Sequence, residues 1–370
     1  MTDKMTPEQT NKQTNQASTQ PTNRVAPQAT TPRLALVGCG AIAEQYYLPA
    51  LARHPAVLSR LVLVDRDRAR AEELAKQFSV GAVTTDYRDI VHEVDGAILA
   101  VPTHLHNPIG LEFLSNGVHV FSEKPLAESA DKAREMVTEA ERAGVVLAAN
   151  YQRRLFPPLA KVKELLDEGG LGAIRSITYR VGEKYDWQSK TDFRFQPGTV
   201  SGGVLRDRGA HVMYVISWWL GGKPEVVSSE NDSLGGPEAV ARVRFQHNGA
   251  GNGGGSVQGD VLLSWLSKFP TTFQVELEGG TLWGDIYDNH SIVLKQPSGR
   301  EKRIRLDMDG AYHAIADGMI TNFLDAMSSG TAPLVSGRDA LPSIQFIDEC
   351  YRAARRFDMP WYDVKEMHNA

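Results

Sequence analysis

The chain has 370 residues, of which 42% are hydrophobic and 23% are charged, enough for one large or two ordinary globular domains. Its 40 Lys and Arg residues against 45 Asp and Glu residues leave a formal charge of -5, which argues against a nucleic-acid-binding protein. No apolar run approaches the roughly 18 residues of a membrane span, and the two cysteines make neither a disulfide framework nor a zinc motif. We therefore expect a soluble, cytoplasmic protein with no metal site and no nucleic-acid or membrane partner.

Residues 1–31 differ in composition from the rest of the chain. Half of the first 30 residues are Thr, Gln or Asn, and the apolar residues are scattered singly. Such a segment cannot bury enough apolar surface to offset the entropy lost on ordering, so we expect a disordered tail. It lacks the apolar run of a signal peptide and any twin arginine, and Asp3, Glu8 and the single Arg24 argue against a transit peptide.

A short apolar strand is expected at 34–37, and a glycine turn of the form G-x-G-x-x-A follows it directly before a helix-like stretch. In this context Gly38 permits a tight turn, Gly40 lets the backbone approach a pyrophosphate, and Ala43 keeps helix and strand close. The first N–H groups of the helix would face the phosphates. The expected cofactor contacts here are Gly38, Gly40, Ala41 and Ile42.

A second apolar strand at 61–64 ends at Asp65. A carboxylate at this position can accept hydrogen bonds from the adenosine ribose, and it would repel a 2′-phosphate. This favours NAD. Arg66 follows directly and could stack on adenine or pair with a 2′-phosphate, which leaves NADP as the alternative.

Strands and helices continue to alternate through the first part of the chain. We expect strands at 96–101, 118–121 and 145–149, and helices at 67–78, 107–116 and 129–143. This alternation predicts an α/β fold, with a doubly wound parallel sheet over residues 32–150. Residues 151–370 are expected to form a second α/β domain with alternating strands between 240 and 294. Its last helices, at 313–327 and 337–357, are expected to pack back on the first domain.

Two groups of residues indicate acid–base chemistry. Lys124 comes just after a strand's carboxyl end, where open α/β sheets bind ligands, and Pro125 stiffens the turn. Farther along, Asp207 and His211 are four residues apart and would share one face of a helix. A carboxylate beside an imidazole can hold its tautomer and raise its basicity, which suits removal of a hydroxyl proton during hydride transfer.

With these motifs in place, residues 33 to 357 resemble the Gfo/Idh/MocA oxidoreductases, the glucose–fructose oxidoreductase and inositol dehydrogenase family. The resemblance depends on the glycine turn, on Val101-Pro102-Thr103-His104-Leu105-His106, on Glu123-Lys124-Pro125, on Gly202-Gly203 followed by Asp207 and His211, and on Asn150-Tyr151-Gln152-Arg153-Arg154.

The resemblance implies a Rossmann domain that binds NAD(P) and a C-terminal α/β domain with an open, mostly antiparallel sheet. That second sheet would carry the substrate cleft and the interface of a homodimer or homotetramer. Lys124, Asp207 and His211 match the catalytic set of the inositol dehydrogenase branch. The further cofactor contacts implied are Val101, Pro102, Thr103, His106, Glu123 and Lys124.

The sequence departs from the family pattern near the catalytic residues. Many members have an aspartate three residues after the histidine, where this chain has Tyr214, so polyol specificity of the inositol type is in doubt. Arg206 and Arg208 flank Asp207, where they could either face solvent or meet an anionic substrate group. The residues expected to bind substrate are Lys124, Tyr151, Arg153, Trp187, Arg194, Asp207 and His211.

The leading hypothesis is an NAD(P)-dependent oxidoreductase acting on a sugar, a sugar derivative or a cyclic polyol. His211, supported by Asp207, would take the hydroxyl proton, and Lys124 would polarise the same oxygen. Which of the two is the primary base stays open at this point. The alternatives are an NAD-dependent glycosidase of the same fold and a non-catalytic, sugar-responsive regulator.

Overall fold

Six parallel strands form the first of two sheets, in the order β3-β2-β1-β4-β5-β6. The computed structural model describes residues 1–2, 31–185, 202–249, 255–306 and 311–358, so the tail predicted for 1–31 lies almost entirely outside it. The order reverses between β1 and β4, which confirms the doubly wound topology. The strands are β1 Leu34–Val37, β2 Val62–Val64, β3 Ala82–Thr84, β4 Gly96–Leu99, β5 His119–Ser122 and β6 Leu147–Ala149.

Helices with one apolar face cover this sheet. In α5, Ser129 caps the first turn by accepting a hydrogen bond from Lys132 N–H, and Gly144 ends the helix at φ +67. The helical stretch after the glycine turn is less regular than predicted: a π-helix precedes α1, and Pro49 lies in the first turn of α1. The elements are η1 Ala43–Tyr47, α1 Leu48–Leu51, α2 Pro55–Leu58, α3 Arg68–Phe78, η2 Tyr87–Asp89, η3 Thr103–Leu105, α4 His106–Ser115 and α5 Ala130–Ala143.

The second sheet has nine strands, in the order β14-β13-β12-β11-β7-β10-β9-β8-β15. Most neighbours are antiparallel, but β7 pairs with β10 and β8 pairs with β15 in parallel. This confirms the mostly antiparallel second sheet. The strands are β7 Ile174–Gly182, β8 Glu225–Asn231, β9 Val240–His247, β10 Val257–Ser264, β11 Phe269–Leu277, β12 Gly280–Asp285, β13 Ser291–Lys295, β14 Glu301–Arg305 and β15 Ala354–Arg356.

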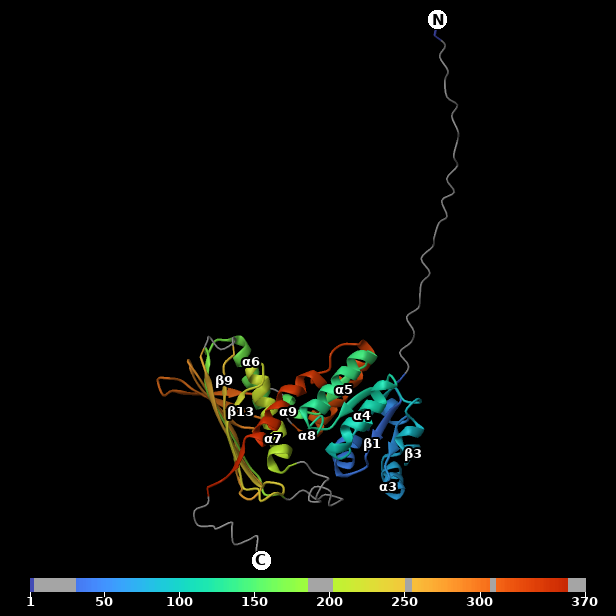
Figure 1. The fold of residues 1–370 in the computed structure, drawn as a ribbon, viewed down its shortest axis with the longest axis horizontal. Coiled ribbons are helices and arrows are strands. Elements are labelled where there is room, and N and C mark those ends of the chain that lie inside the picture. The colour runs from blue at the N-terminus through green and yellow to red at the C-terminus, as the bar shows by residue number, and fades with distance from the viewer. Residues whose placement is uncertain (3–30, 186–201, 250–254, 307–310, 359–370) are drawn as a thin grey trace, which may run out of the picture. The chain divides into compact units, whose positions relative to one another are not determined.

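Helices α7 (Val204–Leu220) and α9 (Gly337–Arg352) lie between the two sheets, each in contact with strands of the second sheet (Figure 1). Helix α9 also contacts α5 and β6 of the first sheet's layer. It is shorter than the helix expected at 337–357, because residues 354–356 form β15 instead. Two 3-10 or α-helical segments, η4 Gln152–Leu155 and α6 Pro157–Glu168, lead from β6 to the second sheet.

Helix α8 (Tyr312–Ser329) packs its apolar side against the first sheet. Its side chains Met319, Ile320 and Phe323 belong to the same buried cluster as Leu34 and Leu36 of β1. The C-terminal part of the chain therefore contributes directly to the core beside the glycine turn.

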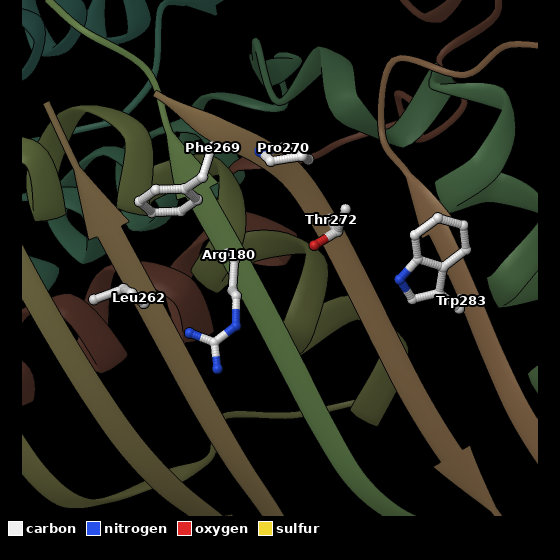
Figure 2. Close-up of a pocket in the computed structure, with 6 residues that line it drawn as sticks. All are labelled: Arg180, Leu262, Phe269, Pro270, Thr272 and Trp283. Atoms are coloured by element: carbon white, nitrogen blue, oxygen red, sulfur yellow. The ribbon is translucent and has the colours of Figure 1, made fainter. Parts of the chain in front are cut away.

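The second sheet has an inner face, on which α7 packs, and an outer face. Along β7, Tyr179 and Val181 are buried on the inner face while Arg180 points outward. Figure 2 shows an outer pocket of about 360 Å³, lined by Arg180, Leu262, Phe269, Pro270, Thr272 and Trp283. This pocket contains none of the residues predicted to be catalytic. Among the described helices, none is both long and apolar enough to cross a bilayer.

Candidate functional site

The glycine turn after β1 has the geometry that a bound dinucleotide needs. Gly38 has φ +100, and a Cβ there would lie 2.4 Å from the carbonyl oxygen of Ala100, so no other residue fits. By contrast, a Cβ on Gly40 would meet nothing within 4 Å. The space over Gly40 is therefore open to a ligand that approaches the backbone closely, as a pyrophosphate does.

Asp65 lies at the end of β2, beside the glycine turn. Its carboxylate accepts hydrogen bonds from Cys39 N–H at 2.7 Å and from Asp67 N–H at 2.9 Å. Each carboxylate oxygen can accept a further bond, which leaves capacity for ribose hydroxyls. Arg66 is exposed and makes no ion pair among the described residues. Burial raises the pKa of the Cys39 thiol to about 12, so this side chain stays protonated and fills space in the turn.

His106 ties together the two loops that follow β4 and β5. Its Nδ1 lies 2.9 Å from the carbonyl oxygen of Pro125, and its Nε2 lies 2.8 Å from that of Val101. The residue is only 1% exposed, and burial lowers its pKa. The expectation that the His106 side chain touches the cofactor is therefore corrected: it positions the loop that carries Lys124.

Glu123 performs a similar positioning role. One carboxylate oxygen accepts hydrogen bonds from Tyr47 O–H and from Asn150 Nδ2, both at 2.7 Å, and the other accepts from Lys124 N–H at 3.0 Å. The peptide bond between Lys124 and Pro125 is cis. These contacts hold the backbone of the predicted catalytic lysine between the first helix and the end of β6.

Lys124 and Asp207 form an ion pair that connects the loop after β5 to α7. The Lys124 Nζ lies 2.8 Å from one carboxylate oxygen of Asp207 and 3.2 Å from its backbone carbonyl oxygen. The two residues are 83 positions apart in the chain, and both side chains are less than one-fifth exposed. The two predicted catalytic groups are thus brought together by the packing of the two sheets' layers.

His211 lies one turn beyond Asp207 on α7, as predicted, but the predicted hydrogen bond between them is not present. The Nδ1 of His211 is buried and has no hydrogen-bond partner within the described part of the chain. Burial, and then the nearby cations Lys124 and Arg153, hold the pKa of His211 well below 6.5, although Asp207 opposes them. The imidazole is therefore neutral at pH 7.

Glu238, which the sequence analysis did not single out, anchors the start of α7. Its backbone carbonyl accepts from Val204 N–H at 2.8 Å, and its carboxylate accepts from Gly203 N–H at 3.0 Å and from Leu205 N–H at 2.9 Å. Tyr351 of α9 donates its hydroxyl to the same carboxylate at 2.8 Å. A buried carboxylate that caps the first N–H groups of a helix also complements the helix dipole.

Nothing local in the sequence marks Glu238, because it lies 35 residues beyond the glycine pair that it contacts. The glycine pair itself carries a signal. A Cβ on Gly203 would come within 1.9 Å of the Glu238 carbonyl oxygen, so the close approach requires glycine.

Tyr151 is part of the core, which corrects the expectation that it contacts substrate. It is 0% exposed, and its ring stacks on Tyr214 with centroids 4.4 Å apart. Tyr214, at the position of the family's aspartate, receives a hydrogen bond from Arg154 at 2.9 Å. Its hydroxyl thus faces Arg154, whose guanidinium also lies over the ring of Trp218 at 5.0 Å.

The two arginines beside Asp207 are engaged within the protein. Arg206 lies 5.0 Å over the ring of Tyr351 and pairs with Asp348 at 3.6 Å, so it neither faces solvent nor the predicted substrate cleft. Arg208 pairs with Glu183 at 2.8 Å. The predicted substrate residues Trp187 and Arg194 lie outside the described residues.

Comparison with known proteins identifies the family. Residues 32–151 match the model of an oxidoreductase family with an NAD-binding Rossmann fold, and residues 159–283 match the C-terminal domain of GFO/IDH/MocA proteins. The chain belongs to the Gfo/Idh/MocA oxidoreductase family. The predicted resemblance is confirmed, as is the assignment of the first sheet to a domain of the NAD-binding type, for which NAD and NADP both fit.

Relatives within the family include several named dehydrogenases. The chain is 27% identical to the levoglucosan dehydrogenase of Pseudarthrobacter phenanthrenivorans over 54% of this chain and 59% of that protein, less than two thirds of its length. It is 23% identical to the scyllo-inositol 2-dehydrogenase (NAD(+)) of Bacillus subtilis over 85% of this chain and 91% of that one.

Solved structures share the fold. A levoglucosan dehydrogenase in complex with NADH and levoglucosan superposes with a TM-score of 0.75 at 18% identity, over 86% of this chain and 96% of that one. At this identity the likeness concerns the fold alone. No group of three or more His, Cys, Asp or Glu side chains in the described ranges could hold a metal ion.

Proposed function

We propose that this chain is an NAD(P)-dependent oxidoreductase that transfers a hydride between the nicotinamide and a hydroxyl or carbonyl carbon of a sugar, a sugar derivative or a cyclic polyol. The observation that carries the proposal is the Lys124–Asp207 ion pair at 2.8 Å, which joins the layer of the nucleotide-binding sheet to α7 of the second domain. The named dehydrogenases and reductases among the relatives support the same class of substrate.

The cofactor-binding residues are proposed from the geometry of the first domain. The open space over Gly40 receives the pyrophosphate, and Ala41 and Ile42 lie at the start of the helix that faces it. Asp65 accepts the ribose hydroxyls, which favours NAD. The loop Val101–Thr103 follows β4 and is half-buried, at the edge where this fold binds its ligand.

The bound cofactor would supply the hydride acceptor, and the chain's own residues manage the proton and the charge. Lys124, held by Asp207, donates a hydrogen bond to the reacting oxygen and stabilises the negative charge that develops there. His211 is neutral and has a vacant ring nitrogen, so it can accept the hydroxyl proton. In the direction of reduction the two residues act in reverse.

The test is turnover that depends on Lys124. Purified protein with NAD or NADP is mixed with polyols, sugars and nucleotide sugars, and the absorbance of reduced nicotinamide is followed. We expect Lys124→Met to lower kcat by roughly 10²- to 10⁴-fold, because the reacting oxygen loses its charged hydrogen-bond donor. Lys132→Met is the matched control, since Lys132 forms an ion pair with Glu128 on α5 away from the site.

Equal turnover by the wild type and Lys124→Met would contradict the proposal. Glycoside cleavage without net cofactor reduction would instead favour the glycosidase alternative. The homodimer or homotetramer and the cytoplasmic location stay predictions.

A further inference from the structure

Arg153 is a buried guanidinium without a carboxylate partner. The residue is 3% exposed, and its Nη1 makes no hydrogen bond in the described part of the chain. The other arginines with little exposure are paired: Arg206 with Asp348 and Arg70 with Glu44. Arg153 is therefore an exception to the way in which this protein buries its arginines.

An unpaired buried cation opposes folding, because it loses its hydration and gains no compensating anion. A protein retains such a group where a ligand supplies the missing partner, and perturbed charges of this kind concentrate at functional sites. The free energy lost in the empty site is recovered when an anion binds. Arg153 thus has the properties of a ligand-binding residue, beyond those of a core residue.

The surroundings of Arg153 place it at the proposed reaction site. It is near enough to lower the pKa of His211, and it also lowers the pKa of Tyr287, which burial raises. Tyr287 is half exposed and donates its hydroxyl to Glu183 at 2.8 Å. Arg153 therefore lies between the catalytic histidine and a side chain that reaches solvent.

The charges around His211 leave one positive charge without a partner. Lys124 is paired with Asp207, and Arg208 is paired with Glu183. Only Arg153 remains unpaired in this group of described residues. A single negative charge on the ligand balances it, whereas a dianionic phosphate would leave a buried negative charge in excess.

We propose that Arg153 binds a carboxylate of the substrate, so that the substrate is a sugar acid or an acidic polyol derivative. This inference rests on the proposed function and narrows its substrate class. A guanidinium can hold a carboxylate through two parallel hydrogen bonds, which also fixes the orientation of the reacting carbon.

The first experiment compares matched neutral and acidic substrates. The turnover of D-glucose is compared with that of D-glucuronate and D-gluconate, and of each neutral sugar in the panel with its acid, for the wild type and Arg153→Gln. We expect kcat/KM of the wild type to favour the acid, and Arg153→Gln to lower kcat/KM for the acid at least about 100-fold, while that for neutral sugars changes less than about threefold.

The matched control is the neighbouring arginine. Arg154→Gln removes an equal charge one residue away, but Arg154 already has protein partners in Tyr214 and Trp218. We expect it to leave the preference for the acid unchanged. A preference that disappears equally in both variants would overturn the assignment to Arg153.

A second experiment does not need turnover. The melting temperature of the NADH-loaded protein is measured with D-glucuronate, D-glucose and inorganic phosphate. We expect only glucuronate to raise it appreciably, and this rise to be lost in Arg153→Gln. Without ligand, Arg153→Gln should melt no lower than the wild type, because it removes an unpaired buried charge. If that variant does not fold, Arg153→Lys keeps the charge but loses the bidentate geometry, and it should show a weakened response to glucuronate.

The outcomes separate this inference from the proposed function. Equal responses to glucose and glucuronate, a stronger response to phosphate, or weaker NADH binding by Arg153→Gln in the absence of substrate would each overturn the carboxylate assignment. Glucuronate binding that requires Arg153, without turnover of any compound, would support the carboxylate site and contradict the oxidoreductase. Turnover of neutral sugars alone, dependent on Lys124, would do the reverse.

Discussion

The substitution Glu238→Gln tests whether a buried carboxylate holds the catalytic helix in place. Glu238 is 2% exposed, and its two oxygens accept bonds from Gly203 N–H, Leu205 N–H and the Tyr351 hydroxyl. Glutamine keeps the size of the side chain but has one oxygen fewer. In the more favourable orientation its oxygen still faces Leu205 and Tyr351, and its NH₂ group then meets the N–H of Gly203.

The expected cost follows from the lost contacts. One hydrogen bond to a charged acceptor contributes about 1.5–3 kcal/mol, and the interaction with the helix dipole about 0.3–1 kcal/mol. Together they lower the free energy of unfolding by about 2–4 kcal/mol. For a protein of this size that corresponds to a melting temperature about 4–8 °C lower. Because α7 carries Asp207 and His211, we expect kcat to fall as well.

Thermal unfolding followed by circular dichroism measures the first effect, and steady-state turnover measures the second. Glu276→Gln is the control, since Glu276 accepts a hydrogen bond from Ser176 at 2.7 Å on the outer face of the second sheet, where water can replace it. Its melting temperature should stay within about 1 °C of the wild type. A melting temperature of Glu238→Gln as high as that of Glu276→Gln would refute the reasoning.

Two further predictions concern the glycine turn and pH. Gly40→Val should raise the Kd for NADH at least ~100-fold, because the new side chain occupies the open space proposed for the pyrophosphate; Gly81→Val, at another glycine with open space, should not, and isothermal titration calorimetry distinguishes them. His211 and His106 have lowered pKa values, so the native state binds fewer protons than the unfolded state below pH 6.5. Stability should therefore decrease as pH falls below about 6.5, by up to about 1.4 kcal/mol per pH unit and group. His211→Asn should reduce this slope in denaturant titrations, and an unchanged slope would show that His211 is not buried neutral.

Much of the fold could be predicted from the sequence because its signals are local. The glycine turn directly follows an apolar strand, and Gly38 is required by contacts that depend on φ and on the neighbouring strand β4. Alternating strands and helices determine a parallel sheet, since each crossover must return on the same hand. The positions of Lys124 and Asp65 at strand ends follow from the same pattern.

The partners of the functional side chains were decided only by the tertiary structure. Residue spacing placed Asp207 and His211 on one helix face, yet the carboxylate of Asp207 pairs with Lys124, which is 83 positions away in the chain. Likewise, the sequence contains the adjacent pair Arg153 and Arg154, but only packing leaves the first buried and unpaired. Local patterns constrain the backbone over a few residues, whereas burial and charge pairing depend on which elements meet across the two sheets.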